Sequence, residues 1–228
     1  TGTRVKSLEI DNDGLIVGDQ LSDCDLIFTT PSHQFPTTVT MPMARRQALL
    51  EQASRDDFLI IEDDYECETS FATNPTPALK SLDQNDRVIY IGSLSKTLSP
   101  GLRMGYLVGP KELIREIREY RRMMLRHPPM NNQRAVGLFL SRGYHDSLVR
   151  SLVQVYEERW KAVSDALQRW LPESANPPTF GGSAYWVKGP ENLDARELKR
   201  LALEQGVVIE SGDIYFQQES PPLNFFRL

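Results

Sequence analysis

The stretch SLSKTLSPGLR, residues 93–103, places one lysine among small hydroxyl side chains and ends in an arginine. A phosphate-binding loop of nucleotidases needs Gly-x-x-x-x-Gly-Lys-Ser/Thr, because glycine amides must approach the polyphosphate closely. Lys96 fits the lysine position, but Tyr90 and Ser95 stand where the two glycines belong. We therefore exclude a phosphate-binding loop of this kind, and Lys96 needs another explanation.

Lys96 is suited to form a Schiff base with an aldehyde, because a lysine amine that loses its proton readily is a good nucleophile. Pyridoxal 5′-phosphate is the common biological partner, and its ring acts as an electron sink while the ring nitrogen stays protonated. A carboxylate beside that nitrogen keeps it protonated by charge pairing. In the segment IEDDYE, residues 61–66, Asp63 is the candidate for this role.

The phosphate and the ring oxygen of such a cofactor need partners of their own. Hydroxyl groups at a strand-to-helix turn and a planar guanidinium are suitable donors to a phosphate. Ser93, Ser95 and Arg103 supply these groups. Tyr65 follows Asp63 by two residues, so both side chains point to the same side of an extended segment. The phenol of Tyr65 is therefore predicted to donate a hydrogen bond to the ring oxygen.

Short apolar segments bounded by turn residues predict the strands that position these side chains. The predicted strands are 5–10, 26–30, 58–61, 88–92 and 105–108, and helical spacing predicts a helix at 43–54. This alternation indicates an α/β fold with a mostly parallel sheet covered on both faces. Ligands of such sheets bind at the carboxyl ends of the strands, which is where residues 31–36, 62–65 and 93–96 fall.

Longer helices and a second strand-rich region follow Pro110. Helices are predicted at 111–126, 131–141, 144–171 and 195–205, and strands at 181–189, 206–212 and 223–228. The helix at 144–171 is long enough to cross between two lobes. We therefore expect a large domain over residues 1–150 and a small α+β domain over residues 151–228.

The composition excludes several classes of protein. Of 228 residues 40% are apolar and 25% are charged, and the net charge of −5 provides no basic face for a nucleic-acid backbone. No apolar run approaches the length of a membrane span and no signal peptide is recognisable, so we expect a cytoplasmic protein. Cys24 and Cys67 form no CxxC motif, and no metal site is predicted.

The segment SLSKTLSPGLRMGY resembles the lysine motif of fold-type-I pyridoxal phosphate enzymes, the aspartate aminotransferase superfamily. More narrowly, residues 30–51 (TPSHQFPTTVTMPMARRQALLE) and 61–66 resemble the aminotransferase-like domain of MocR/GabR transcription regulators. The resemblance covers essentially the whole chain. It implies a homodimer for the parent protein. Thr38 departs from the family pattern, because the family usually has glycine there.

The resemblance implies that Lys96 is the Schiff-base lysine and that the residues around it hold the cofactor. The implied cofactor-binding residues are Asp63, Tyr65, Ser93, Ser95, Arg103 and His33, the last in a loop that flanks the cofactor. Arg227 aligns with the arginine that receives the carboxylate of a substrate or effector.

The resemblance also implies a sensing role. An amino compound would displace Lys96 from the cofactor by forming an external aldimine, and a winged-helix domain upstream of Thr1 would bind DNA. The chain lacks an initial methionine and the family's phosphate-cupping glycine-serine loop, so we expect a fragment, truncated in both domains. A catalytic aminotransferase acting on an amino acid is the alternative, because it uses the same lysine and aspartate. Whether the domain turns over a substrate stays open.

Overall fold

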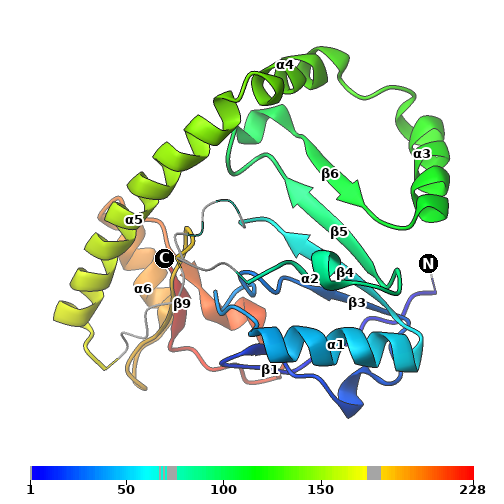
Figure 1. Cartoon of the computed structure of the whole chain (residues 1–228). Helices are drawn as coiled ribbons and strands as arrows, with labels where there is room; N and C mark the ends of the chain where they lie inside the picture. Colours follow the sequence, from blue (N-terminus) through cyan, green and yellow to red (C-terminus); the bar gives the residue numbers. More distant parts are fainter. Residues whose placement is uncertain (1, 67, 69, 71–75, 174–180) are drawn as a thin grey trace.

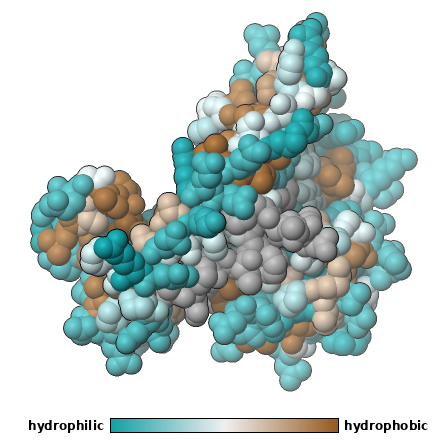
Figure 2. All heavy atoms as spheres, turned by 60° about the vertical axis from the view of Figure 1, so that its left-hand side comes forward, coloured by the Kyte–Doolittle hydropathy of each residue, from teal (hydrophilic) through white to brown (hydrophobic). Residues whose placement is uncertain are grey.

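The computed structural model of the chain describes residues 2–66, 68, 70, 76–173 and 181–228. Figure 1 shows a larger sheet flanked by helices, a smaller body near the C-terminus, and the long helix α5 (Tyr144–Trp170) running toward that body. The surface on the α5 side is mostly hydrophilic, with separate apolar patches (Figure 2). Sheets and covering helices of this kind confirm the predicted α/β class.

The larger sheet has the strand order β3-β4-β5-β6. Strands β3 (Leu26–Thr29), β4 (Leu59–Asp64) and β5 (Val88–Ser93) run parallel, and β6 (Gly105–Val108) pairs antiparallel with β5. The prediction of a mostly parallel sheet is therefore confirmed. The carboxyl ends of β3, β4 and β5 meet at one edge, where the residues predicted to bind a ligand begin.

One face of this sheet is covered by α1 (Met43–Asp56) and the short helix α2 (Leu79–Leu82), as Figure 1 shows. Leu49 of α1 packs with Ile27 and Ile60 of the strands in the buried core. On the other face of β3, Leu26 and Phe28 are 51% and 61% exposed. The prediction of a sheet covered on both faces is therefore wrong for β3 in the described part of the chain, because alternate side chains find packing partners on one side only.

The remaining helices lie within two residues of their predicted bounds, because each has a sustained helical period. They are α3 (Lys111–Leu125), α4 (Met130–Ser141), α5 and α6 (Ala195–Glu204). The predicted strand at 5–10 is wrong. Only β1 (Ile10–Asp11) pairs there, with β2 (Gly14–Leu15), and Val5 is 88% exposed. Leu8 packs against the core. The one backbone–backbone hydrogen bond that residues 5–9 make within the described part of the chain runs from the Ile16 N–H to the Glu9 carbonyl at 3.1 Å, which is too little for a strand.

The smaller sheet is antiparallel and has the order β7-β9-β8. It consists of β7 (Trp186–Lys188), β8 (Glu210–Ser211) and β9 (Phe225–Arg227). Its core includes Val187 and Phe226 and takes in residues of α5 and α6. We call this sheet with its packed helices the smaller lobe, and the larger sheet with α1 and α2 the larger lobe. Trp160 of α5 stacks on Tyr185 with ring centroids 5.6 Å apart. Residue 150, the predicted domain boundary, lies inside α5, so this helix belongs to both predicted domains.

Two further predictions concern membranes and metals. In the described ranges, no helix combines the length and the apolar character that a membrane crossing requires. The same residues contain no cluster of three or more His, Cys, Asp or Glu side chains that could hold a metal ion. Cys24 carries a free thiol, and Cys67 lies outside the described residues.

A buried arginine ties the elements of the larger lobe together. Arg46 of α1 is 0% exposed, and its guanidinium donates hydrogen bonds to the carbonyls of Met41 (3.0 Å), Pro77 (3.1 Å) and Pro31 (2.8 Å). Its Nη1 also lies 3.7 Å from Oε1 of Glu62 in β4. Burial lowers the pKa of Arg46 and raises the pKa of Glu62, so each needs the other's charge and its hydrogen bonds to remain inside.

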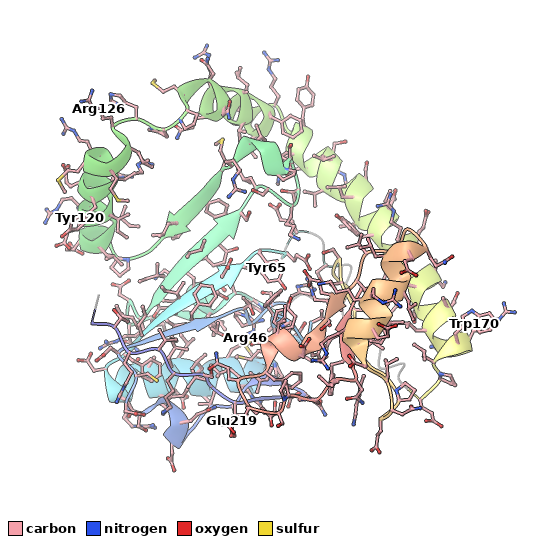
Figure 3. All side chains as sticks on the ribbon, turned by 180° about the vertical axis from the view of Figure 1, so that it is seen from behind. Arg46, Tyr65, Tyr120, Arg126, Trp170 and Glu219 are labelled. Atoms are coloured by element: carbon pink, nitrogen blue, oxygen red, sulfur yellow. The ribbon has the colours of Figure 1, made fainter. Side chains whose placement is uncertain are left out.

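Glu62 is equally well held on its other side. Its two carboxylate oxygens accept the backbone N–H groups of Leu79 (2.7 Å) and Lys80 (2.8 Å), at the start of α2. In Figure 3 Arg46 lies in the interior of the ribbon, whereas Tyr120, Arg126 and Trp170 lie at its periphery. The pair therefore joins α1, β4, α2 and the loop after β3.

Replacing Arg46 with methionine is expected to lower the free energy of unfolding by about 3–5 kcal/mol, because Glu62 then stays buried without a counter-charge. Urea denaturation followed by circular dichroism measures this loss. The double variant Arg46→Met, Glu62→Gln removes both charges and is expected to recover part of the loss. Strictly additive losses in the single and double variants would show that the two charges do not depend on each other.

The loop after β3 contains a strained residue. Thr38 has φ 63°, in the left-handed region that favours glycine, and it is buried. Its N–H donates to the carbonyl of Gln34 at 2.6 Å. A β-branched residue in this region costs about 1–2 kcal/mol. Thr38 thus adopts a backbone conformation that favours glycine, and it stores strain in the loop that also carries His33.

Thr38→Gly is expected to raise the free energy of unfolding by about 0.5 kcal/mol, because the relieved strain exceeds the entropy that glycine loses on folding. Thr37→Gly is the matched control, since Thr37 is not in the left-handed region and should lose stability. The measurement is the urea midpoint of each variant. Equal destabilisation of both variants would contradict the assignment of strain to Thr38.

Candidate functional site

Three loops meet at the carboxyl edge of the larger sheet. The hydroxyl of Tyr65, directly after β4, donates a hydrogen bond to the backbone carbonyl of His33 in the loop after β3, at 3.0 Å. The Nζ atom of Lys96, in the loop after β5, lies 3.8 Å from Oε1 of Glu66. Figure 3 shows Tyr65 near the middle of the molecule. The structure therefore brings together predicted residues that are as many as 63 positions apart (His33 and Lys96).

The loop that carries Lys96 is closed by its own backbone. Leu94 N–H donates to the carbonyl of Met104 at 3.1 Å, and Leu98 N–H donates to the carbonyl of Leu94 at 3.0 Å. The return strand needs glycine at position 105, because a Cβ atom there would lie 2.7 Å from the carbonyl oxygen of Gly92. Within this closed loop the Lys96 side chain is 48% exposed, so its amine is accessible to a ligand.

The predicted phosphate donors belong to the same loop. Ser93 ends β5, and its Oγ accepts the N–H of Ser95 at 3.2 Å. Arg103, at the end of the loop, is exposed and adopts a left-handed φ of 50°. Its guanidinium makes no hydrogen bond or ion pair with any residue that the structure describes. One loop thus offers two hydroxyl groups and an uncommitted cation, a donor set that suits a phosphate.

Three neighbouring carboxylates of β4 have different environments. Glu62 is buried against Arg46, and Asp64 is buried and accepts a hydrogen bond from the Tyr90 hydroxyl at 3.1 Å. Asp63 is half-buried and has no hydrogen bond or ion pair among the described residues. Burial raises its pKa, and the charge of Asp64 raises it further. Asp63 therefore lacks the cationic partner that a protonated ring nitrogen would supply.

Tyr65 and His33 form the inner wall of the site. Burial raises the pKa of Tyr65, so its phenol keeps its proton, which it donates to the carbonyl of His33 at 3.0 Å. His33 is 3% exposed. Burial lowers the pKa of His33, against the opposing charges of Glu66 and Asp64. The imidazole is therefore neutral at neutral pH, and His33 can contribute to the site as a shape and a hydrogen-bonding group rather than as a charge.

Arg227 approaches from the smaller lobe. Its Nη1 donates to Oε2 of Glu210 at 3.1 Å, and its guanidinium lies over the ring of Phe35 at 5.1 Å. The Tyr215 hydroxyl donates to the same Glu210 oxygen at 2.9 Å. Phe35 lies two residues after His33, so Arg227 contacts the loop that the sequence placed beside the cofactor. Sequence reasoning missed Glu210, because only the antiparallel pairing of β8 with β9 brings it opposite Arg227.

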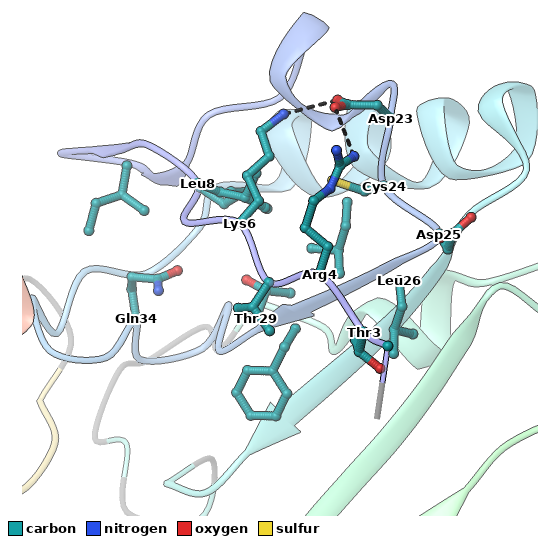
Figure 4. Close-up of a pocket in the computed structure, with 16 residues that line it drawn as sticks. Thr3, Arg4, Lys6, Leu8, Asp23, Cys24, Asp25, Leu26, Thr29 and Gln34 are labelled. Carbon is teal, nitrogen blue, oxygen red and sulfur yellow. Dashed lines mark hydrogen bonds and ion pairs between the residues drawn. The ribbon is translucent and has the colours of Figure 1, made fainter. Parts of the chain in front are cut away.

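A separate cavity of about 700 Å³ lies between the N-terminal segment and β3 (Figure 4). None of the eight predicted site residues lines it. Lys6 and Asp23 on its rim form an ion pair at 2.9 Å, and Phe28 contributes an exposed apolar ring. This cavity borders the uncovered face of β3 and has no part in the candidate site.

The residues at the sheet edge fit pyridoxal 5′-phosphate by their chemistry. They supply an accessible amine on Lys96, a carboxylate without a counter-charge on Asp63, and two hydroxyl groups with a guanidinium in one loop. The missing partners of Asp63 and Arg103 are a cation and an anion, which are the two charged ends of this cofactor.

The buried His33 is expected to make stability depend on pH. Because its pKa is lowered from 6.5, the unfolded chain binds a proton that the folded chain resists. This contribution is complete above pH 6.5 and is lost as the pH falls through the lowered pKa. Urea unfolding at about pH 7.5 and about pH 5.5 should show a smaller pH difference for His33→Gln than for the unaltered chain. Equal differences would mean that His33 does not resist protonation.

Comparison with known proteins places this geometry in a family. Residues 16–220 match the model of "Aminotransferase class I and II". HTH-type transcriptional regulator TauR of Rhodobacter capsulatus is 42% identical over 228 residues, which is 100% of this chain and 47% of TauR. The probable rhizopine catabolism regulatory protein MocR of Rhizobium meliloti is 34% identical over 211 residues, 90% of this chain and 42% of MocR. The chain thus spans about half the length of these curated relatives.

A solved structure agrees with the fold. The kynurenine aminotransferase of Pyrococcus horikoshii, solved in complex with PMP, superposes with a TM-score of 0.85 at 29% identity, over 97% of this chain and 57% of that one. Both the predicted fold-type-I architecture and the resemblance to MocR-type regulators are confirmed, and pyridoxal 5′-phosphate is the cofactor that these similarities imply. The chain belongs to the aminotransferase class I and II family.

Proposed function

We propose that this chain is the cofactor- and effector-binding domain of a MocR-type transcription regulator, and that it senses an amino compound through Lys96. The observation that carries the proposal is the loop 93–103, which offers an accessible amine, two hydroxyl groups and an uncommitted guanidinium and follows β5, the strand in which Ile91 pairs with Asp63. The identity of 42% with TauR along the whole chain supports a regulator.

Pyridoxal 5′-phosphate, when bound, supplies an aldehyde that bonds covalently to amines and a ring that withdraws electrons. Lys96 provides the amine for attachment. Asp63 pairs with the ring nitrogen and gains the counter-charge that it lacks. Ser93, Ser95 and Arg103 hold the phosphate. Because the Lys96 side chain is 48% exposed, an amino compound would have access to the same group, and Lys96 would be the amine that it replaces.

Arg227 gives the effector a second point of attachment. Its Nη1 is engaged by Glu210, but its buried Nε has no hydrogen-bond partner in the part of the chain that the structure describes. An acid group on the effector would therefore have to compete with Glu210 for the guanidinium. This arrangement suits a compound with an amine at one end and a single acid group at the other.

The rest of the proposal concerns the whole protein. With a net charge of −5, this chain provides no basic surface for DNA, so DNA binding would belong to a separate winged-helix domain of the same polypeptide. The parent protein is proposed to be a cytoplasmic homodimer. Exchange of Lys96 for the effector would favour one arrangement of the domains over another, and DNA binding would follow that equilibrium.

A catalytic aminotransferase is the second candidate. The specific observation in its favour is the TM-score of 0.85 with an aminotransferase that was solved with PMP and its substrates. Turnover requires a base that moves a proton at the substrate's α-carbon, and the released Lys96 amine can serve as that base. The two candidates thus share the site and differ in whether a keto acid is formed and released.

Lys96→Ala is expected to abolish covalent attachment of pyridoxal 5′-phosphate. The test incubates the longest polypeptide that contains this chain with the cofactor, reduces it with borohydride, and locates the added mass by mass spectrometry. Lys161→Ala, at an exposed lysine of α5, is the matched control and should keep the label at position 96. A label of undiminished intensity in Lys96→Ala would overturn the assignment of the lysine.

The same preparation separates the sensor from the enzyme. Taurine, γ-aminobutyrate and D-alanine are added in turn, each together with a keto acid such as 2-oxoglutarate or pyruvate as amino acceptor, and each reaction is followed both by visible absorption and by release of the donor's keto acid or aldehyde over many cycles. A sensor changes its spectrum once and stops. Sustained product release at more than about one equivalent per site would establish the aminotransferase instead.

A further inference from the structure

Glu66 is a buried carboxylate that has no role in cofactor binding as described above. It lies two residues beyond β4 and is 4% exposed. Its Oε2 accepts the backbone N–H of Ser183 at 3.3 Å, and its Oε1 accepts the Ser183 hydroxyl. The same Oε1 lies 3.8 Å from the Lys96 amine. One carboxylate thus contacts both the lysine loop and a turn that is 117 residues away in sequence.

The turn at residues 181–183 leads directly into the smaller lobe, because Tyr185 and β7 follow it. Gly182 has φ 107°, and a Cβ atom there would lie 3.0 Å from Nε2 of His33 and 3.2 Å from Oε2 of Glu66. Gly181 also forms a β-bridge with Ser70. The turn is therefore pressed against the candidate site, and only glycine at position 182 allows this close approach.

The two partners of Glu66, Ser183 and Lys96, differ in whether a cofactor would engage them. The Ser183 donors are backbone and hydroxyl groups of the chain that no cofactor would engage, whereas the Lys96 amine is the group that a cofactor would engage. A carboxylate that is withdrawn from water needs both its hydrogen bonds and a counter-charge. When Lys96 is engaged elsewhere, Glu66 must rely on Ser183 and its other neighbours, so the hold on the turn changes with the state of the lysine.

We propose that Glu66 is a positioning residue that couples the free amine of Lys96 to the turn 181–183, and hence to the smaller lobe. While the amine is free, it holds the carboxylate in line with both Ser183 donors and the turn is ordered. When the amine is engaged, the turn loosens. The use of this coupling for sensing rests on the proposed function, but the coupling itself is a property of the chain without cofactor.

Through this coupling, replacement of Lys96 by an effector would change how tightly the turn 181–183 is held. An effector that releases Lys96 restores the contact between Nζ and Glu66, and the turn at the entrance to β7 tightens. Sensing needs an element with two states whose balance both sites bias. Glu66, Ser183 and Lys96 form such an element at the junction of the two lobes.

Hydrogen–deuterium exchange of the cofactor-free chain tests the coupling. Glu66→Gln and Ser183→Ala are expected to raise the exchange rate of peptides that contain residues 182–185 by about tenfold, which is the effect of losing one well-placed buried hydrogen bond. The double variant should show no further increase, because both changes break the same contact. Glu51→Gln, at an exposed carboxylate of α1, is the control and should leave these peptides unchanged.

Lys96 variants separate coupling from a merely structural hydrogen bond. Lys96→Met removes the cation and is expected to raise exchange at residues 182–185 by about threefold, a modest effect because the lysine is half-exposed. Lys96→Arg keeps a cation and should preserve the slow exchange. The proposal is overturned if Lys96→Met exchanges at the rate of the unaltered chain. Because Lys96 is at the surface, this outcome remains readable even if Glu66→Gln fails to fold.

Adding pyridoxal 5′-phosphate distinguishes this proposal from the proposed function. Attachment at Lys96 should raise exchange at residues 182–185 of the unaltered chain to the level of Lys96→Met, and should have no effect on that variant. Attachment without any change in exchange would overturn the coupling. If no cofactor attaches, the proposed function fails, and the cofactor-free comparison of Lys96→Met with Lys96→Arg still decides the coupling.

Discussion

The buried contact between Arg46 and Glu62 is the constraint on which the candidate site depends. Arg46 draws the carbonyl of Pro31 toward α1 at 2.8 Å, and Pro31 begins the loop that carries His33. Glu62 precedes Asp63 in β4, so its burial on the core side directs Asp63 to the other face of the strand. A charge pair inside the core is costly unless fully satisfied. Once satisfied, it fixes the ends of β3 and β4 relative to each other.

The carboxylates of the acidic segment after Ile61 have the same chemistry, but their different environments give them different roles. Glu62 holds structure because Arg46 and two backbone amides surround it. Asp63 is available because nothing described pairs with it, and burial raises its pKa accordingly. Glu66 joins two lobes because Ser183 reaches it. The sequence alone distinguishes these carboxylates poorly, since alternation along a strand predicts which face of the sheet a side chain lies on but not which residues it contacts there.

Much of the fold could be predicted because the relevant signals are local. The helix period gave α1 and α3 to α6 within two residues, and the chemistry of loop 93–103 is contained in eleven consecutive residues. The errors arose where a long-range partner decides the outcome. Residues 5–9 look like a strand but form no strand ladder among the described residues, and one face of β3 stays uncovered. The contacts of Glu66 with Ser183 and of Glu210 with Arg227 depend on how the smaller lobe docks, which no local pattern encodes.

The predicted site residues come from both lobes, and the proposed function depends on this division. Lys96 and Asp63 belong to the larger lobe, whereas Arg227 belongs to the smaller lobe and contacts the larger one by lying over the ring of Phe35 at 5.1 Å. Under the proposed function, a ligand with an amine and an acid group would touch both lobes at once, and its binding energy would act on their relative position. An enzyme would use this to orient a bond for proton transfer, and a regulator would use it as the output. The same residues would serve both uses, so what would separate them is the fate of the ligand after Lys96 is released.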